Sequence, residues 1–237
     1  MSAPPPAITA DMALLLDLDG TLIDFAATPD AVVVPADLPD ALRRLRARLG
    51  DALAVVTGRP IEQVDALLGD LPYAVAGEHG GAIRHAPGAA IVRVAQPAIT
   101  AAWIARAETL AAAHPGVLVE HKTHGIALHF RLAPAAGPAL QALAEALVAA
   151  LPSHAVLPGA MVWEIRPRDV DKGTAVAALM ARPPFAGRVP VFVGDDVTDA
   201  DGMRAARALG GLGLLVDAVF ATPAGVRAWL AREAARG

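Results

Sequence analysis

Short apolar runs alternate with amphipathic segments along this chain, and that order constrains its fold more than any other feature. Residues 13–18 have the length and apolar character of a buried parallel strand, and the run ends in Asp-Leu-Asp-Gly. Residues 38–49 carry leucines at helical spacing with arginines between them. Residues 52–57 predict a second strand, and Pro60 marks the start of a helix that runs to Leu68. Such alternation predicts a mostly parallel sheet.

The alternation stops after a third strand at residues 73–76 and resumes at Asp171. The intervening pattern predicts adjacent antiparallel strands and two helices: helix 98–113, strands 117–122 and 125–131, helix 137–150 and strand 161–166. The resumed pattern predicts helix 172–181, strand 189–193, helix 199–208, strand 212–216 and helix 223–235. We therefore expect a doubly wound α/β domain, residues 1–84 and 167–237, with an inserted α+β domain over residues 85–166.

Charge and composition exclude several classes of partner. The 237 residues carry 20 basic and 24 acidic side chains, a net charge of −4, so no broad basic face is expected for nucleic acid or an anionic membrane. Prolines and a glycine interrupt the longest uncharged stretch, residues 146–163, and the N-terminal residues lack the features of a secretory signal. We expect a cytoplasmic monomer that acts on a small molecule.

Acidic residues follow two of the predicted strands. In a doubly wound sheet ligands bind beyond the carboxyl ends of the strands, so these side chains are expected to converge: Asp17, Asp19, Asp195, Asp196 and Asp199. Two unit charges 4 Å apart repel by about 4 kcal/mol at an effective dielectric near 20. Such a cluster therefore calls for a cation or a protonated member, and an all-oxygen ligand set suits Mg²⁺.

The spacing of Asp17 and Asp19 permits a division of labour. Both carboxylates can reach one reacting centre where the chain curls at the end of a strand. Asp17 is then the nucleophile, and Asp19 protonates a leaving oxygen and later takes a proton from water. Gly20 lets the backbone approach a bound anion closely.

Two further residues fit an anion at the same edge. Thr57 ends the second strand beside a helix N-terminus, which is a common phosphate environment. Lys172 begins a helix, where a cation is unfavourable unless an anion lies near it. The chain has only one other lysine, Lys122, and this scarcity argues against Lys172 being simply a solvated surface residue. His79, in a Gly-x-His-Gly loop, is a candidate for lining the same crevice, and a loop-structuring role is its alternative.

Four segments resemble, in order, the motifs of the haloacid dehalogenase superfamily: Asp17-Leu-Asp-Gly-Thr-Leu, Thr57-Gly-Arg, Lys172-Gly and Gly194-Asp-Asp-Val-Thr-Asp. The resemblance implies a Rossmann-type core with an inserted cap. It also implies phosphate binding by Gly20, Thr57, Gly58 and Lys172, and a metal held by Asp17, Asp19, Asp195 and Asp199. Because dehalogenases of the superfamily lack the second aspartate, Asp19 favours phosphoryl transfer.

Narrower motifs resemble those of the trehalose-6-phosphate phosphatase family, among them Gly77-Glu-His-Gly, Glu120-His-Lys122 and Glu164-Ile-Arg-Pro. The resemblance implies hydrolysis of trehalose 6-phosphate through an aspartyl-phosphate, with substrate contacts from Arg59, His79, Glu120, Lys122 and Glu164. Three alternatives stay open: a phosphatase for sucrose 6-phosphate, one for a mannosyl-phosphoglycerate, and a non-catalytic sugar-phosphate sensor.

Overall fold

The computed structural model describes residues 4–26, 31–94, 99–122, 124–168 and 170–236. By its internal contacts the chain divides into two compact units. The first unit combines Met1–Val94 with Asp171–Gly237, and the second is Ala95–Val170.

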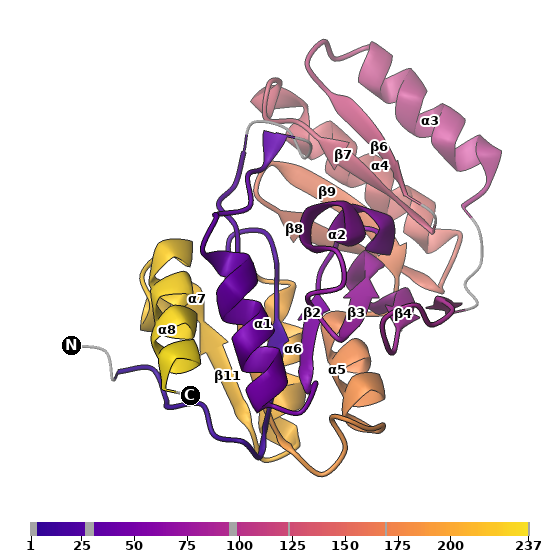
Figure 1. The fold of residues 1–237 in the computed structure, drawn as a ribbon. Coiled ribbons are helices and arrows are strands. Elements are labelled where there is room, and N and C mark those ends of the chain that lie inside the picture. Colours follow the sequence, from indigo (N-terminus) through magenta and orange to yellow (C-terminus); the bar gives the residue numbers. More distant parts are fainter. Residues whose placement is uncertain (1–3, 27–30, 95–98, 123, 169, 237) are drawn as a thin grey trace. The chain divides into compact units, whose positions relative to one another are not determined.

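The first unit is built on a seven-stranded sheet with the order β11-β10-β1-β2-β3-β4-β5 (Figure 1). Five of these strands are parallel neighbours, and the last two pair antiparallel at one edge. The strands are β1 (Met12–Leu16), β2 (Leu53–Val56), β3 (Ala74–Gly77), β4 (Ala82–Arg84), β5 (Val92–Arg93), β10 (Val189–Gly194) and β11 (Leu212–Leu215). This confirms the expected α/β class with a mostly parallel sheet.

Helices accompany this sheet as the sequence pattern predicts, and α1 packs against α8 while α5 packs against α6. Their bounds are α1 (Leu38–Arg48), α2 (Ile61–Leu68), α5 (Lys172–Met180), α6 (Asp199–Ala208), α7 (Val216–Val219) and α8 (Pro223–Ala235), with a 3₁₀ turn at Glu78–Gly80. The core strand β1 shows why the run is apolar, because Ala13 to Leu16 are completely buried. At the start of α8, the hydroxyl of Thr222 accepts a hydrogen bond from the Gly225 N–H, the cap expected there.

The second unit is a four-stranded antiparallel sheet with two helices. Its elements are α3 (Ala101–Ala112), β6 (Leu118–Lys122), β7 (Gly125–His129), a 3₁₀ turn at Pro134–Ala136, α4 (Gly137–Ala149), β8 (His154–Gly159) and β9 (Val162–Pro167). Alternate residues of β7 and β9, including Ile126, Leu128 and Ile165, are fully buried in a separate core with residues of α3 and α4. The strand order is β6-β7-β9-β8.

Two features differ from the sequence-based expectations. Residues 154–159 form strand β8, whereas the sequence pattern predicts no strand between helix 137–150 and strand 161–166. Pro158 is tolerated in β8 because this strand lies at the edge of the sheet. The insert was expected to begin at residue 85, whereas β5 pairs with β4 and so belongs to the first unit's sheet.

Among the helices of the part of the chain described here, none combines the length and the apolar character needed to cross a bilayer.

Candidate functional site

The carboxyl ends of two adjacent strands bring the first carboxylates together. β1 and β10 pair in parallel with Leu16 opposite Val193, and the Asp17 N–H donates to the Val193 carbonyl at 2.9 Å. Asp17 therefore leaves the end of β1 beside the turn that carries Asp195. A side-chain oxygen from each of Asp17, Asp195 and Asp199 lies within 4.8 Å of the others. Three of the five aspartates expected to converge therefore meet in the first unit. Asp196 does not join them, because its Oδ1 accepts hydrogen bonds from the N–H and the hydroxyl of Thr198.

The turn after β1 is tight and glycine-dependent. Gly20 has φ +75°, and a Cβ placed on it would collide with the carboxylate of Asp195. The next residue, Thr21, is completely buried, and its hydroxyl lies 3.4 Å from Oδ2 of Asp17 and 3.4 Å from Oδ1 of Asp195. Sequence reasoning missed Thr21 as a site residue, although its place directly after Gly20 in the motif was a usable signal.

Lys172 occupies the middle of the carboxylate cluster. Its Nζ donates to Oδ1 of Asp17 at 2.7 Å and to Oδ1 of Asp199 at 2.5 Å, and all three side chains are nearly or fully buried. It is the first residue of α5, whose N-cap Asp171 forms a reciprocal capping box with Thr174. The anion expected beside this lysine is thus supplied by carboxylates of the chain itself.

The other oxygen of Asp199 is held by the backbone. Oδ2 accepts hydrogen bonds from the N–H groups of Asp195 at 2.9 Å and Asp196 at 3.1 Å. Since Oδ1 already accepts a hydrogen bond from Lys172, both carboxylate oxygens of Asp199 have hydrogen-bond donors within the protein. Its geometry suits a residue that orders the loop after β10 and reaches a cation through water.

The charges of the cluster do not balance. Three carboxylates and one ammonium leave a formal excess of two negative charges in a mostly buried place. Burial raises the pKa of Asp17 to about 6, of Asp195 to about 6 and of Asp199 to about 7, although Lys172 lowers each in part. Burial opposes the charge of Lys172, but the neighbouring carboxylates raise its pKa above the ordinary value.

This excess of charge, with an all-oxygen donor set, fits a hard divalent cation. Asp17 and Asp195 are the residues best placed to hold it, since each has carboxylate oxygen atoms turned toward the shared Thr21 hydroxyl. The side chain of Asp19 is engaged elsewhere, so its expected share in metal binding rests on its backbone carbonyl alone.

Asp19 forms a two-pronged ion pair with Arg59. Nε of Arg59 donates to Oδ2 at 2.6 Å and Nη2 to Oδ1 at 2.7 Å, which fixes the plane of the carboxylate. Asp19 follows β1 and Arg59 follows β2, and these strands are parallel neighbours. The structure therefore places Arg59, expected to contact substrate, directly on the second aspartate.

The remaining predicted residues of the first unit lie in the loops after β2 and β3. Thr57 is buried, and its hydroxyl accepts from the Arg59 N–H at 3.2 Å. The His79 N–H donates to the Thr57 carbonyl at 2.9 Å, and a Cβ on Gly58 would lie 2.6 Å from the His79 ring. Gly58 thus leaves room for His79, which has φ +56° in its 3₁₀ turn.

The second unit places its predicted residues on one face of its sheet. Glu120 of β6 lies opposite Ala127 of β7, which in turn lies opposite Glu164 of β9, so the two glutamates share a face with Lys122. Lys122 Nζ donates to Oε1 of Glu164 at 2.7 Å. Nε2 of His129 lies 2.9 Å from Oε2 of Glu120. The other face packs against α3 and α4.

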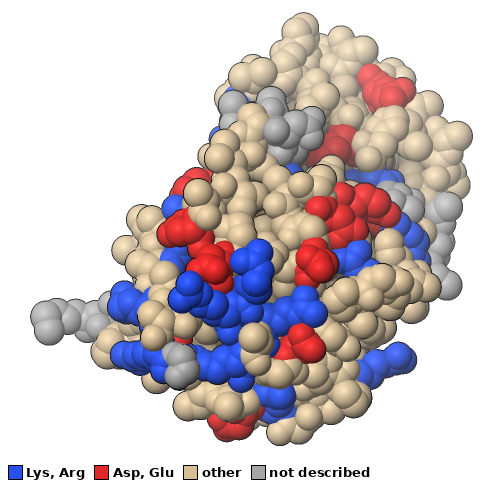
Figure 2. All heavy atoms as spheres, viewed as in Figure 1, with Lys and Arg blue, Asp and Glu red and all other residues tan. Residues whose placement is uncertain are grey.

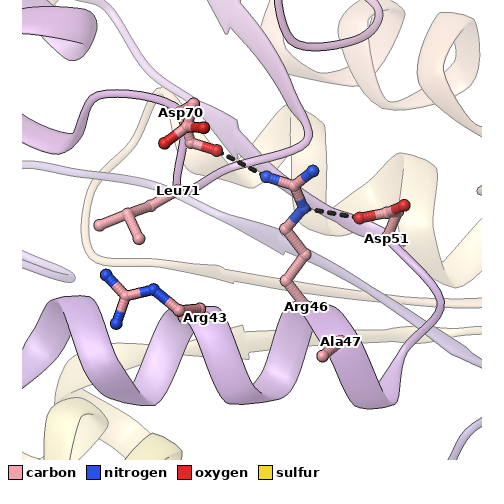
Figure 3. A pocket seen from close by; sticks show the side chains of 6 residues that line it. All are labelled: Arg43, Arg46, Ala47, Asp51, Asp70 and Leu71. Carbon is pink, nitrogen blue, oxygen red and sulfur yellow. Dashed lines mark hydrogen bonds and ion pairs between the residues drawn. The ribbon is translucent and has the colours of Figure 1, made fainter.

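A shallow pocket over α1 is lined by none of the predicted site residues of the first unit (Figure 3). Figure 2 shows Lys and Arg side chains gathered over this helix. Arg46 is already engaged there, because it donates to Asp51 at 2.7 Å and to the Asp70 carbonyl at 2.6 Å. It also lies over the ring of Tyr73. The hydrogen bonds of Arg46 thus hold α1 against the neighbouring loops, which gives this pocket a structural role.

The chain is similar to known proteins over most of its length. The chain is 44% identical over 214 residues to a probable trehalose-phosphate phosphatase of Sinorhizobium fredii, covering 89% of this chain and 80% of the relative. It is 37% identical to a trehalose-6-phosphate phosphatase of Escherichia coli, covering 89% and 79%. The solved C-terminal domain of a trehalose-6-phosphate phosphatase from C. albicans matches with TM-score 0.79 at 20% identity, over 95% of this chain and 93% of that one.

The fold of the chain is that of the haloacid dehalogenase-like hydrolases, and its curated relatives define it as a phosphoric monoester hydrolase. The family model of the trehalose-phosphatases matches residues 15–228. The chain belongs to the trehalose-phosphatase family.

Proposed function

We propose that this protein hydrolyses trehalose 6-phosphate to trehalose and inorganic phosphate, with Mg²⁺ as its cofactor. One observation carries the proposal: the buried carboxylate of Asp17 lies beside Lys172 at the end of β1, with Asp19 two residues further along the chain. The names of its relatives support the choice of substrate.

Asp17 and Asp19 divide the chemistry. An oxygen of Asp17 attacks phosphorus, the bond from phosphorus to the sugar oxygen breaks, and Asp19, protonated and released from Arg59, gives that oxygen its proton. Water then attacks phosphorus, Asp19 takes the proton of the water, and the bond to Asp17 breaks to release phosphate. Lys172 keeps Asp17 in place and contributes positive charge for the phosphoryl oxygens, and Thr57 and Gly58 add a hydroxyl and close backbone approach.

The residues for the cation are Asp17 and Asp195, with the Asp19 carbonyl and with Asp199 acting through water. Bound Mg²⁺ supplies charge neutralisation for the phosphoryl oxygens. The unbalanced negative charge of the cluster supports this assignment.

The second unit is proposed to recognise the sugar as a cap. Glu120, Lys122 and Glu164 share one face of its sheet, and carboxylates that accept from hydroxyl pairs suit a disaccharide. The Lys122–Glu164 ion pair orients one of those carboxylates before substrate arrives. The monomeric state and the cytoplasmic location stay predictions.

The experiment is phosphate release by the purified protein from four substrates: trehalose 6-phosphate, sucrose 6-phosphate, glucose 6-phosphate and a small aryl phosphate. We expect a strong preference for trehalose 6-phosphate that EDTA abolishes and Mg²⁺ restores. Activity on the aryl phosphate alone would keep the chemistry of Asp17 and reject the substrate. No release from any substrate would favour a sugar-phosphate sensor.

A further inference from the structure

An exposed aromatic ring lies directly beside the carboxylate site. Phe25 is 72% exposed, and a Cβ placed on Gly20 would lie 2.7 Å from Cε2 of its ring while also meeting the Asp195 carboxylate. The edge of the Phe25 ring and the carboxylate of Asp195 therefore both lie directly beside Gly20. Isolated exposed apolar side chains are common on protein surfaces, so it is the position of Phe25 that calls for an explanation.

The turn that carries Phe25 is fixed by hydrogen bonds. The Ile23 N–H donates to the Leu18 carbonyl at 3.0 Å, and the Gly20 N–H donates to the Ile23 carbonyl at 2.8 Å. From α8, Arg227 donates to the Leu22 carbonyl at 3.2 Å and to Asp24 at 3.0 Å. The backbone on the N-terminal side of Phe25 is thus held at the site from two directions.

The other phenylalanines have ordinary structural roles. The chain contains five. Three are buried in the first unit, Phe185, Phe192 and Phe220, and Phe130 stacks with Trp163 in the second. Val197, in the loop after the neighbouring strand β10, is also 68% exposed. The loops that carry the carboxylates therefore present apolar side chains to solvent next to a strongly polar centre.

We propose that Phe25 is a specificity-determining residue that packs against the apolar face of the phosphorylated sugar ring. In a sugar 6-phosphate only the C6 atom and its oxygen separate the ring from phosphorus, so the ring of a substrate bound at Asp17 must lie close to the carboxylates. The C–H groups of a pyranose face pack well on an aromatic ring. This apolar contact needs no hydrogen bond between the ring and the sugar. This inference rests on the proposed function and extends it to the leaving group.

The test compares Phe25→Ala with wild type on trehalose 6-phosphate, glucose 6-phosphate and propyl phosphate, which has no ring. We expect KM for both sugar phosphates to rise about tenfold in the variant, since one aromatic contact is worth about that much, with propyl phosphate unchanged. Phe25→Trp, which keeps an aromatic ring at this position, should have a KM close to that of the wild type. Val33→Ala, at an equally exposed apolar residue of the first unit, is the matched control and should change nothing.

Two results would overturn the proposal. An equal change for propyl phosphate and the sugars would mean that Phe25 supports the site or contacts another part of the protein. Unchanged KM values for all three substrates would mean that the ring of Phe25 does not contact the bound sugar. The substrate preference of the wild type reports separately on the proposed function, because the ratio of variant to wild type can be taken on whichever sugar phosphate the enzyme cleaves.

Discussion

Lys172 and Asp17 form a buried ion pair with 2.7 Å between Nζ and Oδ1, although 155 positions separate them along the chain. Asp17 follows the first strand, and Lys172 begins the first helix after the inserted unit. The pair therefore joins the two chain segments of the first unit at the site itself. It also gives the otherwise acidic cluster its one buried ammonium among the residues described.

Replacing this lysine should cost stability. We predict that Lys172→Met lowers the free energy of unfolding by about 3 to 5 kcal/mol at pH 8, because two buried carboxylates lose their partner. Lys122→Met removes a lysine whose pair with Glu164 is partly exposed and should cost less than about 1 kcal/mol. Urea unfolding of both variants without metal checks this; similar losses in the two would contradict the burial argument.

The raised pKa values predict a dependence of stability on pH. The folded pKa of Asp195 is about 6, above its ordinary 3.8, so folding strengthens proton binding at this group. Its stabilising contribution is therefore full below pH 4 and is lost as the pH rises through about 6. In EDTA, wild type should lose stability relative to Asp195→Asn over this range.

Thermal unfolding of both proteins at a series of pH values measures the difference, and titratable groups outside the carboxylate cluster cancel. Added Mg²⁺ should raise the Tm of wild type more than that of Asp195→Asn, because a ligand that binds only the folded state stabilises it. A difference in stability that is constant with pH would show that folding does not raise the pKa of Asp195.

The two-pronged ion pair should matter for turnover. Arg59→Lys keeps the charge but cannot grip both oxygens of Asp19, so we predict that kcat on a small aryl phosphate falls about tenfold to a hundredfold. Arg84 makes a matching pair with Asp65 in the same unit, with distances of 2.6 and 2.7 Å. Arg84→Lys is thus the control and should leave kcat unchanged. Equal kcat in the Arg59 variant and wild type would remove Arg59 from the mechanism.

The sugar-binding role of the second unit makes a selective prediction. Glu164→Gln should raise KM for trehalose 6-phosphate about tenfold, since the neutral amide is a weaker acceptor for sugar hydroxyls and loses its pair with Lys122. Hydrolysis of the aryl phosphate should continue at the wild-type rate. Glu145→Gln, on the exposed surface of α4, serves as control. An unchanged KM would place sugar recognition elsewhere.

The sequence predicts the site well where local pattern and topology agree. Asp17 and Asp195 each follow an apolar run, and the end-of-strand rule for parallel sheets brings them together. The scarcity of lysine singled out Lys172 before its partners were known. These inferences need only the order of elements, which hydrophobic periodicity reports reliably.

The sequence could not predict which partner each group takes. Arg59 lies 40 positions from Asp19, and only the parallel pairing of β1 with β2 turns that separation into contact. Periodicity does not single out Thr21, whose hydroxyl lies between two carboxylates, and only its place after Gly20 in the motif could have done so. Strand β8 was missed because Pro158 is informative only once the strand is known to lie at an edge.

The most direct test of the central claim is to trap the covalent intermediate. Protein mixed with labelled trehalose 6-phosphate and Mg²⁺ is quenched in acid within a single turnover, and the labelled peptide is mapped. The account predicts a phosphoryl group on Asp17 that hydroxylamine removes, and its absence from Asp17→Asn. Label on another residue, or full phosphate release by Asp17→Asn, would contradict it.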